Sequence, residues 1–123
     1  MKIREAIEAF RKQVPNNKIT DEELIRWLDQ TDRQVKQEII DIRYGAKDVV
    51  FNGYTIDTDW DTELIVPSPY DDSYISYLKA KSYLVINDMV KYNVAMAMYN
   101  NEISNWRNFY NRKHRSLPVP LKF

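Results

Sequence analysis

The chain has 123 residues, of which 44% are hydrophobic and 29% are charged. This length fits a single domain over residues 1–123, and this composition fits a folded protein and excludes an intrinsically disordered one. No apolar run approaches the roughly 18 residues that a membrane span needs. The first residues are amphipathic and charged, and the chain has no cysteine. We therefore expect synthesis in the cytoplasm, no secretory signal and no disulfide framework.

The charges are distributed unevenly, although the net charge is zero. Residues 1–43 hold nine basic and nine acidic side chains, residues 44–72 hold one basic and seven acidic, and residues 73–123 hold eight basic and two acidic. The middle segment therefore has a net charge of −6 and the last third a net charge of +6. Two arrangements fit this pattern: head-to-tail contact between copies, and neutralisation within one monomer.

Two helices are predicted in the first part of the chain, over residues 2–14 and 20–43. Pro15 ends the first. The second opens with a capping box, in which Thr20 accepts a hydrogen bond from the amide of Glu23 and the Glu23 side chain reaches back, and Gly45 stops it. Both carry apolar residues at helical spacing: Ile3, Ile7, Phe10 and Val14 in the first, and Leu24, Leu28, Thr31, Val35, Ile39 and Ile42 in the second.

The middle segment changes from a helical period to an alternating one. In "VVFNGYTI", the pair Asn52-Gly53 lies between two β-branched or aromatic triplets. Asn-Gly accepts positive φ at both central positions of a tight turn, so the pattern predicts a small β-hairpin within residues 48–66. Leu64 to Val66 is a third extended piece that could pair with it. An isolated hairpin is marginally stable, so this one is expected to lean on helices or on a neighbouring subunit.

Two further helices are predicted over residues 72–87 and 88–113. Asp71, Asp72 or Ser73 can cap the third helix. Asn87 can end it in a left-handed conformation, and Asp88 can cap the fourth. The buried side of the third is expected to carry Tyr74, Ile75, Leu78, Ser82 and Val85, and the fourth repeats at alternating spacings of three and four: Met89, Tyr92, Met96, Tyr99, Ile103, Trp106 and Tyr110.

Patterns typical of a chemical site are weak. The acidic run from Asp57 to Glu63 resembles the start of a calcium loop, but Thr62 replaces the glycine and Ser68 the final glutamate that such a loop requires. His114 is the only histidine and lies near a helix end, where a cation meets the helix dipole favourably. No nucleophile motif and no glycine-rich phosphate loop occurs. We therefore expect no catalytic residue, no metal and no cofactor.

The end of the chain combines basic, aromatic and apolar residues. Arg107, Arg112, Lys113 and Arg115 lie beside Trp106, Phe109 and Tyr110, a mixture that can bind phosphates and stack on bases, or that simply ends a helix whose rings are core. The tail "RSLPVPLKF" places apolar residues at alternate positions on a segment that cannot form a helix. Such a segment can add as a strand or lie in a groove on another protein, and disorder is the alternative.

Three stretches of the sequence resemble one protein family. They are "DTELIVPSPYDDSYISYLKAKSYLVIND", "KYNVAMAMYN" and "FYNRKHRSLP". Together they resemble the small head-tail connector, or adaptor, proteins of tailed bacteriophages. The resemblance covers about residues 20–118 and is most specific between Glu63 and Arg115. The chain departs from the family pattern at Ile103 and Trp106, where smaller or Tyr- and Phe-type residues are expected.

The resemblance implies an all-α bundle of about four helices with an extended arm between the second and third. It implies about twelve copies in a ring in the virion neck, beneath the portal, through which DNA passes without sequence-specific binding. The partners would be the portal protein, a stopper, tail-completion or tail protein, and further copies, with no membrane. The implied contacts lie in the arm, residues 48–70, at the end of the fourth helix and in the tail, residues 115–123: Asp57, Asp59, Trp60, Asp61, Tyr70, Arg112, Arg115, Leu117, Val119, Leu121 and Phe123.

Two alternatives remain open from the sequence. A stopper or tail-completion protein belongs to the same setting as the adaptor. A small DNA-binding packaging or regulatory protein belongs to another class, and would use the basic end of the last helix.

Overall fold

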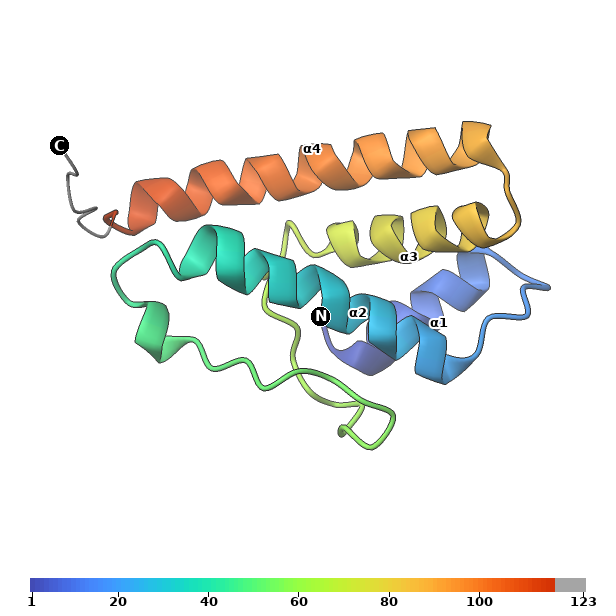
Figure 1. Cartoon of the computed structure of the whole chain (residues 1–123), viewed down its shortest axis with the longest axis horizontal. Helices are drawn as coiled ribbons and strands as arrows, with labels where there is room; N and C mark the ends of the chain where they lie inside the picture. Colours follow the sequence, from blue (N-terminus) through green and yellow to red (C-terminus); the bar gives the residue numbers. More distant parts are fainter. Residues whose placement is uncertain (117–123) are drawn as a thin grey trace, which may run out of the picture.

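A computed structural model describes residues 1–116 of the chain. It contains four α-helices and, within the described residues, no strand. The helices are α1 (Ile3–Gln13), α2 (Asp21–Val35), α3 (Asp72–Val85) and α4 (Met89–Lys113) (Figure 1). A π-helical turn, η1 (Lys36–Ile40), continues α2, and a short 3₁₀ turn, η2 (Ala46–Asp48), follows. The predicted all-α bundle is therefore confirmed.

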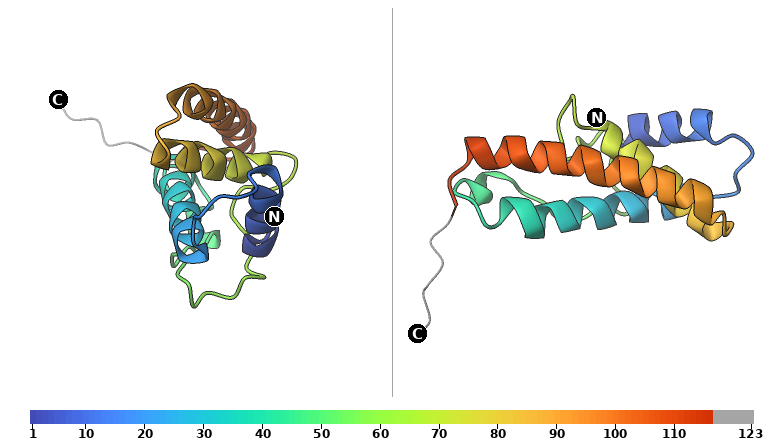
Figure 2. Two further views of the ribbon diagram at one scale, coloured as in Figure 1. Left: turned by 90° about the vertical axis from the view of Figure 1, so that its right-hand side faces the viewer. Right: turned by 90° about the horizontal axis from the view of Figure 1, so that it is seen from above.

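Helix α3 is the central element of the bundle. It packs against α4 on one side and against α1 and α2 on the other (Figures 1 and 2). A helix with neighbours on two sides is buried over most of its surface, and small residues let those neighbours approach closely. Its sequence fits this position, because the buried residues of α3 include both large and small side chains: Ser73, Tyr74, Ser76, Tyr77, Leu78, Ala80 and Ser82.

The helix ends follow local signals in the sequence, with two differences. Thr20 accepts a hydrogen bond from the Glu23 amide, as predicted, but the Glu23 carboxylate binds Arg26 instead of completing the capping box. Asn87 has a φ of 59°, and the Asp88 side chain caps α4 at the Lys91 amide, both as predicted. Asp71 is the N-cap residue of α3, one of the three predicted positions, but its side chain accepts no capping hydrogen bond.

The predicted apolar stripes form the core except at their ends. The stripe of α2 and η1 is buried from Leu24 to Ile39, and the seam of α4 is buried at its C-terminal half. Ile42, Val85 and Met89 are exposed. Ile42 lies beyond the end of η1, and Val85 and Met89 are the last residue of α3 and the first of α4. Tyr99 on the seam also bonds to α2, with 2.7 Å between its hydroxyl oxygen and Thr31 Oγ1.

The β-hairpin predicted for residues 48–66 is not supported. Gly53 has a φ of 83°, but Asn52 is not in the left-handed region, so the tight turn that needs both does not form. The Tyr54 amide, which a hairpin would pair with a neighbouring strand, instead donates to the Asp29 carboxylate of α2 at 2.9 Å. The segment therefore runs over the helices as an extended chain.

A buried carboxylate fixes this extended segment to the bundle. Asp32 of α2 accepts hydrogen bonds from the hydroxyls of Tyr54 and Tyr74, at 2.5 and 2.6 Å, and from the Ile65 amide at 3.1 Å. The Tyr74 hydroxyl in turn accepts from the Val66 amide at 2.6 Å. One side chain of α2 thus joins both ends of the segment to α3.

Residues 60–64 pair with the beginning of α1 instead of with the segment around Asn52-Gly53. The amides of Ile3 and Arg4, which have no partner within the first helical turn, donate to the carbonyl oxygens of Thr62 and Trp60 at 3.1 and 2.9 Å. The Leu64 amide donates to the carbonyl of Met1 at 2.9 Å. The acidic part of the middle segment is therefore held by α1.

Among the described residues, no helix has the length and apolar character to cross a membrane.

Candidate interaction surfaces

The acidic loop, residues 55–63, is the exposed turn of the middle segment. It contains predicted contact residues Asp57, Asp59, Trp60 and Asp61. The Arg4 guanidinium lies 5.7 Å from the centre of the Trp60 ring and 3.2 Å from the Asp61 carboxylate, so this half of the loop is neutralised by α1. Among residues 1–116, Asp57 and Asp59 form no ion pair, and both are exposed.

The loop is ordered by its own hydrogen bonds. The Thr55 amide donates to Thr58 Oγ1 at 2.8 Å, and the Thr58 amide donates to the Thr55 carbonyl oxygen at 3.0 Å. The Asp61 amide donates to Asp59 Oδ1 at 2.9 Å. The loop therefore presents its exposed side chains on a fixed backbone.

The end of α4 and the residues just after it include two more predicted contact residues, Arg112 and Arg115. Arg112 is exposed, and the Arg115 guanidinium lies 6.0 Å from the centre of the Tyr44 ring. His114 stacks on Tyr110, with ring centres 3.8 Å apart, so the histidine serves packing in this structure. The predicted contacts at Leu117, Val119, Leu121 and Phe123 lie outside the described residues.

The aromatic rings of this region are part of the core. Trp106 and Tyr110 are buried, and burial raises the pKa of the Tyr110 hydroxyl above its ordinary value. Phe109 packs on Tyr70, another predicted contact residue, with ring centres 5.7 Å apart. These rings are not displayed for base stacking, so the interpretation of a helix end with core aromatics is favoured over a nucleotide-binding platform.

The structure does not bring the acidic loop and the basic end of α4 together. α4 lies along one side of the bundle and the acidic loop lies at the opposite side (Figures 1 and 2). Asp61 and Glu63 are neutralised by Arg4 and by the α-amino group of Met1, at 3.2 and 3.3 Å. Neutralisation within one monomer is therefore partial, and it involves the first helix instead of the last third of the chain.

A third surface was not predicted from the sequence. The α3–α4 apolar face is the set of large exposed hydrophobic side chains at the end of α3, in the turn that follows it and in the first half of α4; Val90 and Ile86 are exposed by 76% and 68%. Its members are Leu84, Val85, Ile86, Met89, Val90, Val94 and Met98. Large exposed apolar surface of this kind marks contact sites in soluble proteins, so this face is a candidate for burial against a partner.

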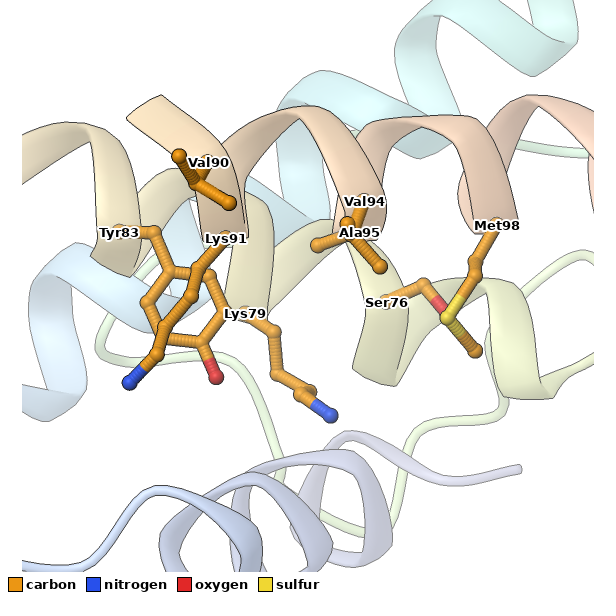
Figure 3. Close-up of a pocket in the computed structure, with 8 residues that line it drawn as sticks. All are labelled: Ser76, Lys79, Tyr83, Val90, Lys91, Val94, Ala95 and Met98. Carbon is orange, nitrogen blue, oxygen red and sulfur yellow. The ribbon is translucent and has the colours of Figure 1, made fainter. Parts of the chain in front are cut away.

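A groove of about 240 Å³ runs along this face between the two helices (Figure 3). Helix α4 contributes Val90, Lys91, Val94, Ala95 and Met98. Helix α3 contributes Ser76, Lys79 and Tyr83. Figure 3 shows the apolar side chains following α4, while the amino groups of Lys79 and Lys91 lie near the Tyr83 hydroxyl. The α3–α4 groove is thus apolar along α4 and cationic at one edge.

A signal for this surface was present in the sequence. Val90, Val94 and Met98 are spaced by four residues, a helical stripe separate from the predicted seam. The regular repeat from Met89 to Tyr110 predicts one packed face of the helix and does not account for this second stripe. A helix with two apolar faces needs two partners, and the monomer supplies one of them.

The described residues contain no group of three or more His, Asp or Glu side chains placed to hold a metal ion. Comparison of the chain with protein-family models, with curated proteins and with solved structures finds no match. What the protein does is therefore inferred from its sequence pattern and from its surfaces.

Proposed function

We propose that the chain is a structural virion protein of a tailed bacteriophage, an adaptor of which about twelve copies form a ring between the capsid portal and the tail or stopper. Its action is docking. The helical bundle is a rigid wedge, neighbouring copies and the portal cover its exposed surfaces, and the ring extends the channel through which DNA passes. No catalytic group, cofactor or sequence-specific DNA contact belongs to this proposal.

The observation that carries the proposal is the exposed α3–α4 apolar face. A small protein that leaves so many large apolar side chains uncovered gains free energy by burying them, at roughly 25 cal/mol per Å² of apolar area. The sequence resemblance then supplies the setting, the phage neck. The long non-helical segment between α2 and α3 agrees with the arm that the resemblance implies, although this segment lies against the bundle.

The test is the location of the protein in the virion. We expect mass spectrometry to detect the chain in purified necks, and a labelled antibody against the chain to bind at the head-tail junction. A nonsense mutation in the gene is expected to give DNA-filled heads without tails. Reading frames for a portal and a major capsid protein are expected beside the gene. Complete virions that lack the chain would contradict the proposal.

A DNA-binding packaging or regulatory protein is the second candidate. The observation in its favour is a group of exposed cations at the end of α4: Arg107, Arg112, Lys113 and Arg115. A protein that contacts duplex phosphates through these residues binds more weakly as salt rises, with a slope set by the number of phosphates neutralised. Tight, salt-sensitive binding of the purified chain to duplex DNA would favour this candidate. The adaptor proposal predicts only weak binding.

A further inference from the structure

The α3–α4 groove has a chemistry that defines its occupant. An occupant of the groove would place apolar side chains against Val90, Val94 and Met98. It would place carboxylates near the ammonium groups of Lys79 and Lys91. Lys79 donates to the neutral Gln13 Oε1 at 3.3 Å and forms no ion pair among the described residues. Lys91 forms one long ion pair, with 3.9 Å between its amino group and the Asp88 carboxylate, and is otherwise exposed.

The two ends of the groove differ in charge. Next to Met98 a second hollow is lined by the acidic Asp72 and Glu102 together with Lys79, whereas Lys91 lies at the opposite end of the groove. An acidic group beside Asp72 and Glu102 would be repelled, so the carboxylates of an occupant are favoured between Lys79 and Lys91. The occupant is therefore an acidic segment with at least one exposed apolar side chain.

The chain itself contains such a segment. In the acidic loop, Ile56 is 46% exposed and is followed by the exposed carboxylates of Asp57 and Asp59, which have no ion pair among residues 1–116. Because hydrogen bonds of Thr55 and Thr58 already fix the loop, docking it costs little conformational entropy. By contrast, the tail "RSLPVPLKF" carries no acidic side chain and does not match the lysine edge.

The loop and the groove of one molecule are far from each other. The loop lies at the side of the bundle opposite to α4 (Figures 1 and 2). Two complementary surfaces that cannot meet within one copy can bind each other between neighbouring copies, head to tail. Such contacts form a closed ring when the rotation that relates one copy to the next returns to the first copy.

We infer that the α3–α4 groove of one copy receives the acidic loop of a second copy, with Ile56 against Val90 and Val94 and the carboxylates of Asp57 and Asp59 facing Lys79 and Lys91. This inference rests on the proposed function, because it names the contact by which the ring is built. It assigns the receiving surface to the first half of α4 instead of to the basic C-terminal end.

The test uses two variants, each with one surface blocked. Val94→Glu blocks the groove. Ile56→Ser with Asp57→Asn and Asp59→Asn blocks the loop, and the asparagine at position 59 can still accept the Asp61 amide that fixes the turn. Sedimentation velocity of the purified full chain at low salt is expected to show concentration-dependent assembly for the wild type, and at least tenfold weaker assembly for each variant alone. Lys12→Glu, on an exposed position of α1, is the control and is expected to assemble like the wild type.

Mixing the two variants is the decisive step. The groove-blocked copy has an intact loop and the loop-blocked copy has an intact groove, so the mixture is expected to form a one-to-one dimer and nothing larger. Circular dichroism of each variant checks that the helices are retained. No dimer in the mixture, or wild-type assembly by either variant alone, would overturn the inference.

A cross-link extends the test to the virion. The chain has no cysteine, so Ile56→Cys with Val94→Cys introduces an unambiguous pair. Oxidised necks are expected to give a covalent ladder, and Glu8→Cys with Val94→Cys is expected to give none. Normal necks without a covalent ladder would contradict the proposed groove contact but not the adaptor role. A one-to-one dimer formed by a chain that is absent from necks would support the groove contact and contradict the adaptor role.

Discussion

Asp32 is a carboxylate in the interior of the bundle, and its partners explain why it is there. It accepts from Tyr54, Tyr74 and the Ile65 amide, which satisfies the charge and joins three parts of the chain. Buried charges with good hydrogen bonds persist in native structures because removing one partner leaves the others unsatisfied. The role of Asp32 is therefore structural.

Replacement of this side chain is expected to be severe. Asp32→Ala removes the acceptor for two hydroxyls and one amide that stay buried, so the free energy of unfolding should fall by about 3 kcal/mol or more. Urea unfolding followed by circular dichroism measures the change. Glu8→Ala, at an exposed position of α1, is the control and should change it by less than about 0.5 kcal/mol. Equal effects would show that the network contributes little.

The same residue predicts a pH dependence. Burial, partly offset by the three donors, raises the pKa of Asp32 from 3.8 to about 6. Between those values the folded protein binds more protons than the unfolded chain. The contribution of Asp32 to the free energy of unfolding is therefore greatest at low pH, falls by about 3 kcal/mol as pH rises through about 6, and is then constant.

Comparison with Asp32→Asn isolates this contribution, because asparagine does not titrate. We expect the difference in urea midpoint between the wild type and the variant to change between about pH 4 and about pH 7, in the direction of relative loss for the wild type. A difference that stays constant over this range would mean that the pKa of Asp32 is not raised by folding.

At the scale of elements, the middle segment takes its course from contacts with α2. Gly53 has a positive φ, and a Cβ there would lie 3.0 Å from both Arg33 Nη2 and Asp29 Oδ1. These two side chains are bonded to each other, and Asp29 also holds the Tyr54 amide. The glycine therefore lets the backbone approach α2 closely.

Two glycine substitutions separate backbone strain from this close approach. Gly45 has a similar φ of 86°, but its nearest neighbours would lie 3.8 Å from an added Cβ. Gly45→Ala should therefore cost about 1 kcal/mol from conformation alone, and Gly53→Ala about 1 kcal/mol more. Thermal or urea unfolding of the two variants gives both values. A smaller cost at Gly53 than at Gly45 would contradict the account of this contact.

Much of the helical fold could be predicted from local signals. Helix limits followed Pro15, Thr20, Asn87 and Asp88, because these residues act within one turn of their own position. The course of residues 48–66 could not be predicted from the sequence. Side chains of the two types do alternate there, but the Tyr54 amide donates to a side chain of α2 instead of to a neighbouring strand. Spacing along the chain does not reveal such a long-range competitor.

The candidate site was predicted less completely. The acidic loop is exposed, as its composition suggested. The buried Asp32 resembled an ordinary surface charge, since only the tertiary structure places two tyrosines on it. The stripe of Val90, Val94 and Met98 was readable, and its exposure depends on the position of α4 at the side of the bundle.

At the scale of the molecule, the charge asymmetry of the sequence becomes a separation in space. The loop carries carboxylates at one side and α4 carries cations along the other. Reversal of charge at Asp57 and Asp59, to lysine, should weaken assembly of the chain at least tenfold and leave its helix content unchanged by circular dichroism. Reversal at Asp61 is not equivalent, because that side chain also binds Arg4.

Sedimentation velocity of this double variant measures the effect. The control is Glu8→Lys, an exposed acidic position of α1 that forms no ion pair among the described residues, which should leave assembly unchanged. Assembly that survives reversal at Asp57 and Asp59 would show that the loop is not part of the contact between copies.

We propose that this protein works as a ring that fits between larger assemblies. Native mass spectrometry and negative-stain microscopy of the chain, expressed together with the portal protein of the same genome, test this role. We expect a ring of about twelve copies stacked coaxially on the portal. A portal that remains bare while the chain stays monomeric beside it would rule this role out.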